Sequence, residues 1–258
     1  MILNKIISAK KEEVAHLKQT RPLLEIKSAI HDLPPVRDFR SAIKGHACAI
    51  IAEVKRRSPS KGILREDFNH TKIASIYEKH GAAAISVLTD QKFFGGNARY
   101  LADIKKTVHL PLLRKDFIID QYQIYETRSL HGDALILIAG ILEKEQLREY
   151  IRLTESLGLS ALVEVHFKED LDKALDSGAN IIGINNRNLS TFSTELNTSL
   201  NLIPHIPADK IIISESGIQV RNDIETLMKA GIHAFLIGEI LMRSENIGEK
   251  LSELLGKL

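Results

Sequence analysis

The sequence of 258 residues contains one cysteine, Cys48, so no disulfide can form within the chain. A lone thiol is typical of proteins in a reducing compartment, and we expect a cytoplasmic protein. No apolar run approaches the roughly 18 to 20 residues that a membrane-spanning helix needs. The apolar pair Ile6-Ile7 is soon followed by charged residues. The sequence therefore predicts neither a signal peptide nor a membrane partner.

The chain also has almost no excess of one charge, because it contains 35 Lys and Arg residues and 33 Asp and Glu residues. A formal charge of +2 offers no general attraction to nucleic acid, which we exclude as a partner. The 10 histidines form no His-x-His or His-x-x-x-His pair. Because such spacings are typical of metal ligands, we expect no metal site.

A repeating pattern organises the rest of the chain. Helix-like stretches end at a glycine, and a short apolar run follows, as after Gly81, Gly132, Gly158, Gly178 and Gly231. Glycine commonly follows the last residue of a helix. Short apolar runs without alternation are typical of parallel strands that are covered on both faces. Six units between Gly81 and Gly231 give a period of 25 residues.

Eight such runs predict eight parallel strands, each followed by a helix. The predicted strands are 49–54, 83–88, 111–114, 134–138, 160–165, 181–185, 210–214 and 234–237. This number favours an α/β fold of the (β/α)8 (TIM) barrel type. An open doubly wound sheet is the alternative. It rarely needs eight units, and no Gly-x-Gly-x-x-Gly follows the first strand.

The residues before the first strand lie outside the repeating pattern of strands and helices. We expect residues 1–258 to make one barrel domain, with residues 1–45 as an N-terminal helical extension. Helical patterns cover 4–19, 23–31 and 38–44. We expect the extension to pack on the barrel and to help close one end.

Polar residues gather where the predicted strands end, which is where such barrels carry their chemistry. Glu53 and Lys55 lie two apart and so share a strand face. We expect both to point into the barrel, since burying charge against the helices is costly; the alternative is a solvated salt bridge. Lys115 and Glu164 would be a general acid and a general base, or a structural ion pair. The guanidinium of Arg187 suits a carboxylate or a phosphate.

Glycines after the last two strands indicate a phosphate site. Ser216-Gly217 and Gly238-Glu239 offer backbone N–H groups at the loops where barrels commonly hold phosphate, and the segment after Ser58 could add donors. After the second strand, Phe93-Phe94-Gly95-Gly96 would line an aromatic substrate or simply pack in a long loop.

These motifs together resemble those of indole-3-glycerol phosphate synthase. The resemblance rests on Glu53-Val54-Lys55-Arg56-Arg57-Ser58-Pro59-Ser60, Phe93-Phe94-Gly95-Gly96, Leu113-Arg114-Lys115-Asp116-Phe117, Val163-Glu164-Val165-His166, Asn185-Asn186-Arg187, Ser214-Glu215-Ser216-Gly217 and Gly238-Glu239. The motifs occur in order and cover every loop at the mouth of the expected barrel. The extension before the first strand also fits this family.

The resemblance implies the closure of an indole ring, with loss of carbon dioxide and water, in tryptophan biosynthesis. The substrate would be 1-(2-carboxyphenylamino)-1-deoxyribulose 5-phosphate, and no cofactor or metal would be needed. By matched position, Lys115 would be the general acid and Glu164 the general base. Lys55 would hold the carboxylate or act as a second acid, and Glu53 would assist dehydration.

The remaining matched positions would bind the substrate. Arg187 and Asn185 would orient it, Glu215 and Ser216 would bind hydroxyls, and Phe93 and Phe117 would line the aromatic ring. Phosphate would be held by Ser58, Gly217, Gly238 and Glu239, with the Glu239 carboxylate pointing away from it.

Two other functions stay open at this point. One is a barrel aldolase that forms a Schiff base on Lys115 or Lys55, and the other is a non-catalytic protein that binds a phosphorylated ligand. We expect a monomer or a weak homodimer, and the sequence leaves a non-covalent pathway partner open.

Overall fold

Eight parallel strands close into a barrel in the computed structural model, which describes residues 2–188 and 191–257. Around the barrel the strand order is β1-β10-β9-β8-β7-β6-β5-β4. The strands are β1 (Ala49–Val54), β4 (Ala84–Leu88), β5 (Leu112–Lys115), β6 (Ala134–Ile138), β7 (Ser160–Val165), β8 (Ile181–Asn185), β9 (Ile211–Glu215) and β10 (Ala234–Ile237). The predicted (β/α)8 barrel is confirmed, and each strand begins and ends within one residue of its predicted bounds.

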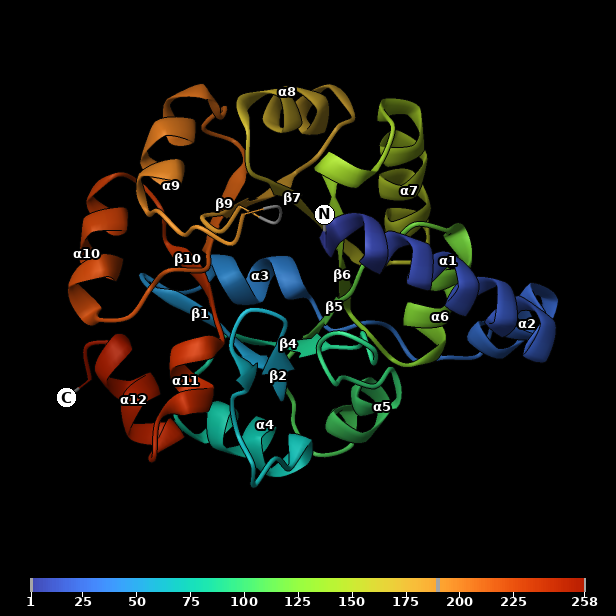
Figure 1. Ribbon diagram of the computed structural model, residues 1–258, viewed down its shortest axis with the longest axis horizontal. Helices are drawn as coiled ribbons and strands as arrows, with labels where there is room; N and C mark the ends of the chain where they lie inside the picture. Colours follow the sequence, from blue (N-terminus) through green and yellow to red (C-terminus); the bar gives the residue numbers. More distant parts are fainter. Residues whose placement is uncertain (1, 189–190, 258) are drawn as a thin grey trace.

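Helices surround this barrel as an outer ring (Figure 1). They are α4 (His70–Lys79), α5 (Arg99–Lys105), α6 (Gln121–Ser129), α7 (Lys144–Ser156), α8 (Lys168–Asp176), α9 (Asn197–Leu202), α10 (Arg221–Lys229), α11 (Glu239–Arg243) and α12 (Ile247–Leu254), with 3-10 turns at Ala139–Ile141 and Ile203–His205. Side chains on the outer strand faces, such as Ile50 and Leu135, pack against the helices. The inner faces form their own buried cluster, which includes Ile51 and Leu113. Burial on both faces explains why these strands are continuously apolar.

Three helices precede the barrel: α1 (Ile2–Thr20), α2 (Leu23–Ile30) and α3 (Phe39–Lys44). Phe39 and Ile43 of α3 belong to the cluster inside the barrel, together with residues at the beginnings of the strands. Helix α3 therefore plugs the end of the barrel at which the strands begin. Helix α1 lies near α6, with its first residues towards the centre of the molecule in Figure 1.

A short antiparallel hairpin, β2 (Arg57–Ser58) and β3 (Gly62–Ile63), follows β1 and was not predicted. Two-residue strands are too short to leave an alternating pattern in the sequence. The hairpin turns through Gly62, whose φ is +68°. Among the described residues, no helix is long and apolar enough to span a membrane.

Candidate active site

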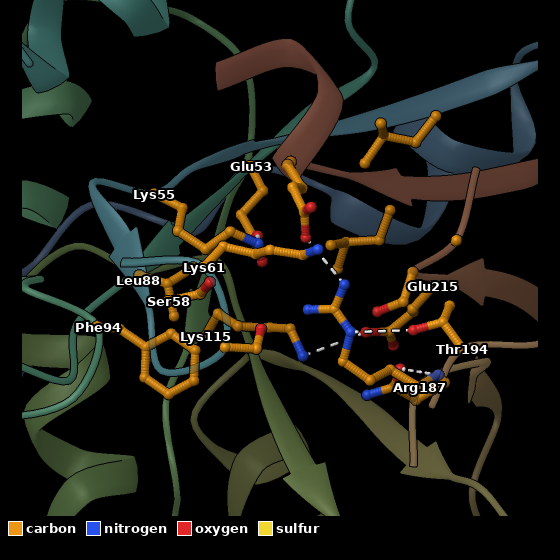
Figure 2. Close-up of a pocket in the computed structure, with 18 of the residues that line it drawn as sticks. Glu53, Lys55, Ser58, Lys61, Leu88, Phe94, Lys115, Arg187, Thr194 and Glu215 are labelled. Carbon is orange, nitrogen blue, oxygen red and sulfur yellow. Dashed lines mark hydrogen bonds and ion pairs between the residues drawn. The ribbon is translucent and has the colours of Figure 1, made fainter. Parts of the chain in front are cut away.

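A cavity of about 810 Å³ opens at the ends of the strands, on the side opposite α3. It is lined by thirteen of the fourteen residues that the sequence analysis assigned to the site: Glu53, Lys55, Ser58, Lys115, Phe117, Glu164, Asn185, Arg187, Glu215, Ser216, Gly217, Gly238 and Glu239. Figure 2 shows Lys55, Lys115 and Arg187 directing their charged ends towards one shared space. The strand ends thus gather these side chains in one place.

Lys115, the last residue of β5, lies between two carboxylates from β7 and β9. Its Nζ is 2.7 Å from Glu164 Oε2 and 3.2 Å from Glu215 Oε2. Burial lowers the pKa of Lys115, but Glu164, Glu215 and Glu53 outweigh it and raise this pKa above its usual value. The resting side chain is therefore an ammonium with a proton to donate.

Glu164 is held from its other side by Asn185 on the neighbouring strand β8. Asn185 Nδ2 donates to Glu164 Oε1 over 3.1 Å, and Asn185 Oδ1 accepts from the backbone N–H of Arg187 over 3.0 Å. With one oxygen bound to Lys115 and the other to Asn185, the Glu164 carboxylate has a fixed orientation. His166 lies nearby, but its Nδ1 is 2.7 Å from the backbone oxygen of Asn185.

Glu53 and Lys55 are both buried and form an ion pair, which confirms that they turn into the barrel. Two glycines, Gly183 on β8 and Gly238 directly after β10, leave room for the carboxylates of Glu215 and Glu53. A Cβ on Gly238 would lie 2.3 Å from Glu53 Oε1, and a Cβ on Gly183 would lie 2.1 Å from Glu215 Oε1. Any larger side chain at these positions would displace the carboxylates. Gly183 was not identified from the sequence as a site residue.

Glu215 is 1% exposed; its Oε2 pairs with Lys115, and its Oε1 has no hydrogen-bond partner among the described residues. Burial raises the pKa of Glu215 to about 7; Lys115 opposes this rise, and Glu164 and Glu53 add to it. Glu215 Oε1 is therefore a free acceptor beside the ammonium of Lys115.

Arg187 pairs with Glu239, the first residue of α11. Arg187 Nη2 is 2.8 Å from Glu239 Oε2. Burial raises the pKa of Glu239, but the hydrogen bond and charge of Arg187 lower it more, so the net pKa lies below its usual value. Glu239 lines the cavity and its carboxylate faces Arg187; that it points away from a bound phosphate stays a prediction.

The aromatic wall consists of Phe94 and Phe117, whose ring centroids are 6.1 Å apart. The assignment of Phe93 to this wall needs correction, because Phe94 lines the cavity in its place. Asp90 Oδ1 accepts from the backbone N–H of both Phe93 and Phe94, and this turn directs the two consecutive rings differently. Both rings pack against an apolar cluster around Ile6 of α1, but Phe93 does not line the cavity. Nothing in the sequence distinguishes two adjacent phenylalanines.

Ser58 has the features of a ligand donor. It is 4% exposed, lines the cavity, and its hydroxyl has no hydrogen-bond partner among the described residues. Lys61 and Arg243 also line the cavity and add positive charge, although the sequence analysis did not select them. Lys61 stands in the same Ser-Pro-Ser-Lys-Gly motif as Ser58, and Arg243 lies one helical turn after Glu239, so both could have been found by position.

The cavity thus combines a protonated lysine, an oriented carboxylate, an aromatic wall and several cations that can bind anionic groups. Within residues 2–188 and 191–257, no three His, Cys, Asp or Glu side chains are grouped so that they could hold a metal ion. The arrangement is suited to proton transfer on an anionic, partly aromatic molecule.

Comparison with known proteins gives one consistent result. A family model described as "Indole-3-glycerol phosphate synthase" matches residues 3–254. The chain is 51% identical over 255 residues to the indole-3-glycerol phosphate synthase of Alkaliphilus metalliredigens, with 98% of each chain covered. It is 46% identical over 257 residues to that of Chromobacterium violaceum, covering 98% of this chain and 97% of the relative.

Solved structures of other proteins share the fold. A 3-hexulose-6-phosphate synthase matches with a TM-score of 0.65 at 12% identity, over 81% of this chain and 99% of that one. A thiamine phosphate pyrophosphorylase from Pyrococcus furiosus matches with a TM-score of 0.61 at 14% identity, over 81% of this chain and 95% of that one. At such low identity these likenesses support the barrel alone.

Proposed function

This chain belongs to the indole-3-glycerol phosphate synthase family, and we propose that it converts 1-(2-carboxyphenylamino)-1-deoxyribulose 5-phosphate to indole-3-glycerol phosphate. The enzyme is then a carboxy-lyase of tryptophan biosynthesis. The observation that carries the proposal is the Lys115–Glu164 pair, which places a charged acid beside an oriented base within the cavity.

Ring closure needs an acid at the substrate ketone. The aniline nitrogen donates electrons into the ring, and the ring carbon that bears the carboxylate attacks the ketone carbon. A carbon–carbon bond forms, and the ketone oxygen becomes an alkoxide. Lys115 donates a proton to this oxygen, and its carboxylate neighbours keep it protonated until then.

Loss of carbon dioxide and water completes the indole. The bond between the ring carbon and the carboxylate breaks. Its electron pair restores the aromatic ring and neutralises the positively charged nitrogen. The hydroxyl then leaves as water with a second proton from an acid, for which Lys55 or Lys115 is in place, and Glu53 assists. Glu164 accepts the proton from the amine side. Two protons are delivered and one is removed, so each turnover takes up one proton from solvent.

The remaining residues would hold the substrate. Arg187 and Lys55 would bind its carboxylate, and Phe94 and Phe117 would enclose its aromatic ring. The free Oε1 of Glu215, together with Ser216, would bind hydroxyls.

The phosphate would take its hydrogen bonds from the Ser58 hydroxyl and from backbone N–H groups after the last two strands. The candidates for these N–H groups are Gly217, Gly238 and Glu239. Lys61 lines the same cavity and would add charge attraction to the phosphate.

The state of Lys115 argues against a Schiff-base aldolase. A lysine that attacks a carbonyl must be a neutral amine, which requires a lowered pKa. The carboxylates around Lys115 have the opposite effect. A phosphate-binding protein without activity would not need the Lys115–Glu164–Asn185 arrangement.

We also propose that the enzyme acts in the cytoplasm, as a monomer or a weak homodimer. Its single cysteine, Cys48, is free, as expected in a reducing compartment.

The direct test is indole fluorescence after mixing the protein with 1-(2-carboxyphenylamino)-1-deoxyribulose 5-phosphate in excess chelator. We expect a steady rise that scales with the protein concentration, and a loss of at least about a hundredfold in rate for Lys115→Met. No rise from folded protein with intact substrate would reject the activity. Borohydride treatment with substrate should leave no covalent adduct; an adduct on Lys115 or Lys55 would favour the aldolase.

A further inference from the structure

A second charged cluster borders the cavity through Asp116, and its central group comes from the N-terminal extension. The side chain of Lys10, on α1, is 1% exposed. Its Nζ lies 2.9 Å from Asp116 Oδ1, 3.3 Å from Asp90 Oδ2 and 2.9 Å from Glu13 Oε2. Lysine is rarely buried unless it is paired with acidic groups. Two of its three partners belong to loops at the mouth of the barrel.

Asp90, in the loop after β4, holds the backbone of the two phenylalanines that follow it. Its Oδ1 accepts from the N–H of Phe93 over 2.8 Å and from the N–H of Phe94 over 3.0 Å. Its other oxygen faces Lys10. The carboxylate thus links α1 to the turn that places Phe94 on the cavity wall.

Asp116 makes the same kind of link on the next strand. Its Oδ1 accepts from the backbone N–H of Phe117 over 2.8 Å, and its Oδ2 is 3.1 Å from Arg114 Nη2. Burial raises the pKa of Asp116, but Lys10 and Arg114 outweigh it and hold this pKa well below its usual value. Asp116 also follows Lys115 directly in the chain. Its carboxylate therefore anchors the backbone between the proposed acid and the second aromatic wall residue.

Apolar contacts on α1 reinforce these links. Ile6 lies one turn before Lys10, on the same side of the helix. Ile6 is buried in a cluster with Phe117 and Ile138, against which Phe93 and Phe94 also pack. The aromatic wall is therefore backed by α1 through both charge and packing.

We propose that Lys10 is a positioning residue, whose ammonium holds Asp90 and Asp116 and through them fixes the aromatic wall and the backbone at Lys115. This inference rests on the function proposed above. Without the ammonium, Asp90 would lose its cation and Asp116 would keep only Arg114, so two buried carboxylates would face each other without a charge between them, and the turns that they hold would loosen. Small displacements of groups that orient a substrate reduce turnover strongly.

The test compares Lys10→Met, which keeps the length of the side chain and removes its charge, with Lys18→Met on the same helix. Lys18 is a matched control because its pair with Asp120 is partly exposed and lies outside the cavity. For Lys10→Met we expect kcat to fall about tenfold to a hundredfold at a temperature where the variant stays folded. Lys10→Arg, which restores the charge, should recover most of this loss, and Lys18→Met should stay within about twofold of the wild type.

Amide hydrogen exchange tests the proposal without depending on catalytic activity. It is measured in peptides that cover residues 89–95 and 115–118. We expect faster exchange there in Lys10→Met but not in Lys18→Met. Unchanged exchange and kcat, with only a lower Tm, would reduce Lys10 to a stabilising residue and overturn the proposal. An inactive wild type would instead reject the function, and the exchange measurement would still decide whether Lys10 orders these turns.

A double variant keeps the test usable if Lys10→Met does not fold. Lys10→Met/Asp116→Asn removes both charges of the 2.9 Å pair and leaves Asp90 without its ammonium. We expect faster exchange at Phe93 and Phe94 in this variant. Exchange equal to that of the wild type would overturn the proposal.

Discussion

Arg187 and Glu239 are joined across the cavity mouth, with Arg187 Nη2 2.8 Å from Glu239 Oε2. Both side chains keep contact with solvent, at 20% and 26% exposure. The guanidinium that we assign to the substrate carboxylate is therefore already occupied by a carboxylate of the protein. Substrate binding must exchange one anionic partner for another.

This exchange predicts that Glu239→Gln binds substrate more tightly. Exposed ion pairs contribute up to about 1 kcal/mol, so KM should fall by up to about fivefold, with kcat within about twofold. Steady-state kinetics measure both constants. Glu253→Gln is the control, because it breaks the 2.8 Å pair with Lys250 on α12, outside the cavity. A higher KM for Glu239→Gln would show that this carboxylate helps to bind the substrate.

Ser58→Ala should raise KM about tenfold or more and leave kcat nearly unchanged, because the hydroxyl is assigned to the phosphate and not to the reacting atoms. Its buried oxygen has no partner among the described residues, so its removal should leave Tm unchanged or slightly higher. Kinetics and thermal unfolding test the two statements separately. An unchanged KM would move the phosphate site away from Ser58.

The raised pKa of Glu215 predicts that the free energy of unfolding depends on pH. Its pKa rises from about 4.5 to about 7 in the folded protein, so between these values the folded state binds more protons than the unfolded state. The stabilising contribution of this group is complete below pH 4.5 and is lost as the pH rises through 7. The Tm of Glu215→Gln relative to the wild type should therefore increase between pH 5 and pH 8. A difference that is constant with pH would contradict the raised pKa.

Gly183→Ala should disturb the site from within the barrel. The new methyl group would lie 2.1 Å from Glu215 Oε1 and must displace that side chain, at a cost of about 1–3 kcal/mol in stability. We expect kcat to fall at least about tenfold, because Glu215 contacts Lys115. Gly140→Ala is the matched control, since its nearest atom, in Asp170, would be 3.5 Å away. Equal effects of the two substitutions would remove the proposed role of Gly183.

The barrel could be predicted from the sequence because each strand leaves a signal in a few consecutive residues. Five of the eight strands are short apolar runs after a helix-ending glycine, two are apolar runs at the positions that the spacing requires, and the first is an apolar run that precedes the series. The polar residues at the strand ends follow from chain position alone. Glu53, Lys115 and Glu164 meet because parallel strands end on the same side of the barrel. The position of each motif at the end of a predicted strand is therefore enough to predict that these side chains meet.

Features that depend on distant partners were not predicted. Lys10 stands in a charged segment of α1 that resembles a solvent-facing helix, and only Asp90 and Asp116, far along the chain, explain its burial. The direction of Glu239 depends on Arg187, and the choice between Phe93 and Phe94 depends on the turn at Asp90. Such contacts leave no periodic pattern in the sequence.

Helix α3 also constrains the order in which the protein can fold during synthesis. Phe39 and Ile43 fill the barrel from one end, yet the barrel closes only when Ala49 of β1 pairs with Ala234 of β10. The ribosome makes β10 last among the strands, so the apolar side of α3 has no complete binding surface until nearly the whole chain has emerged. Until then Phe39 and Ile43 lack most of the partners that bury them, and apolar side chains exposed in an incomplete chain promote aggregation.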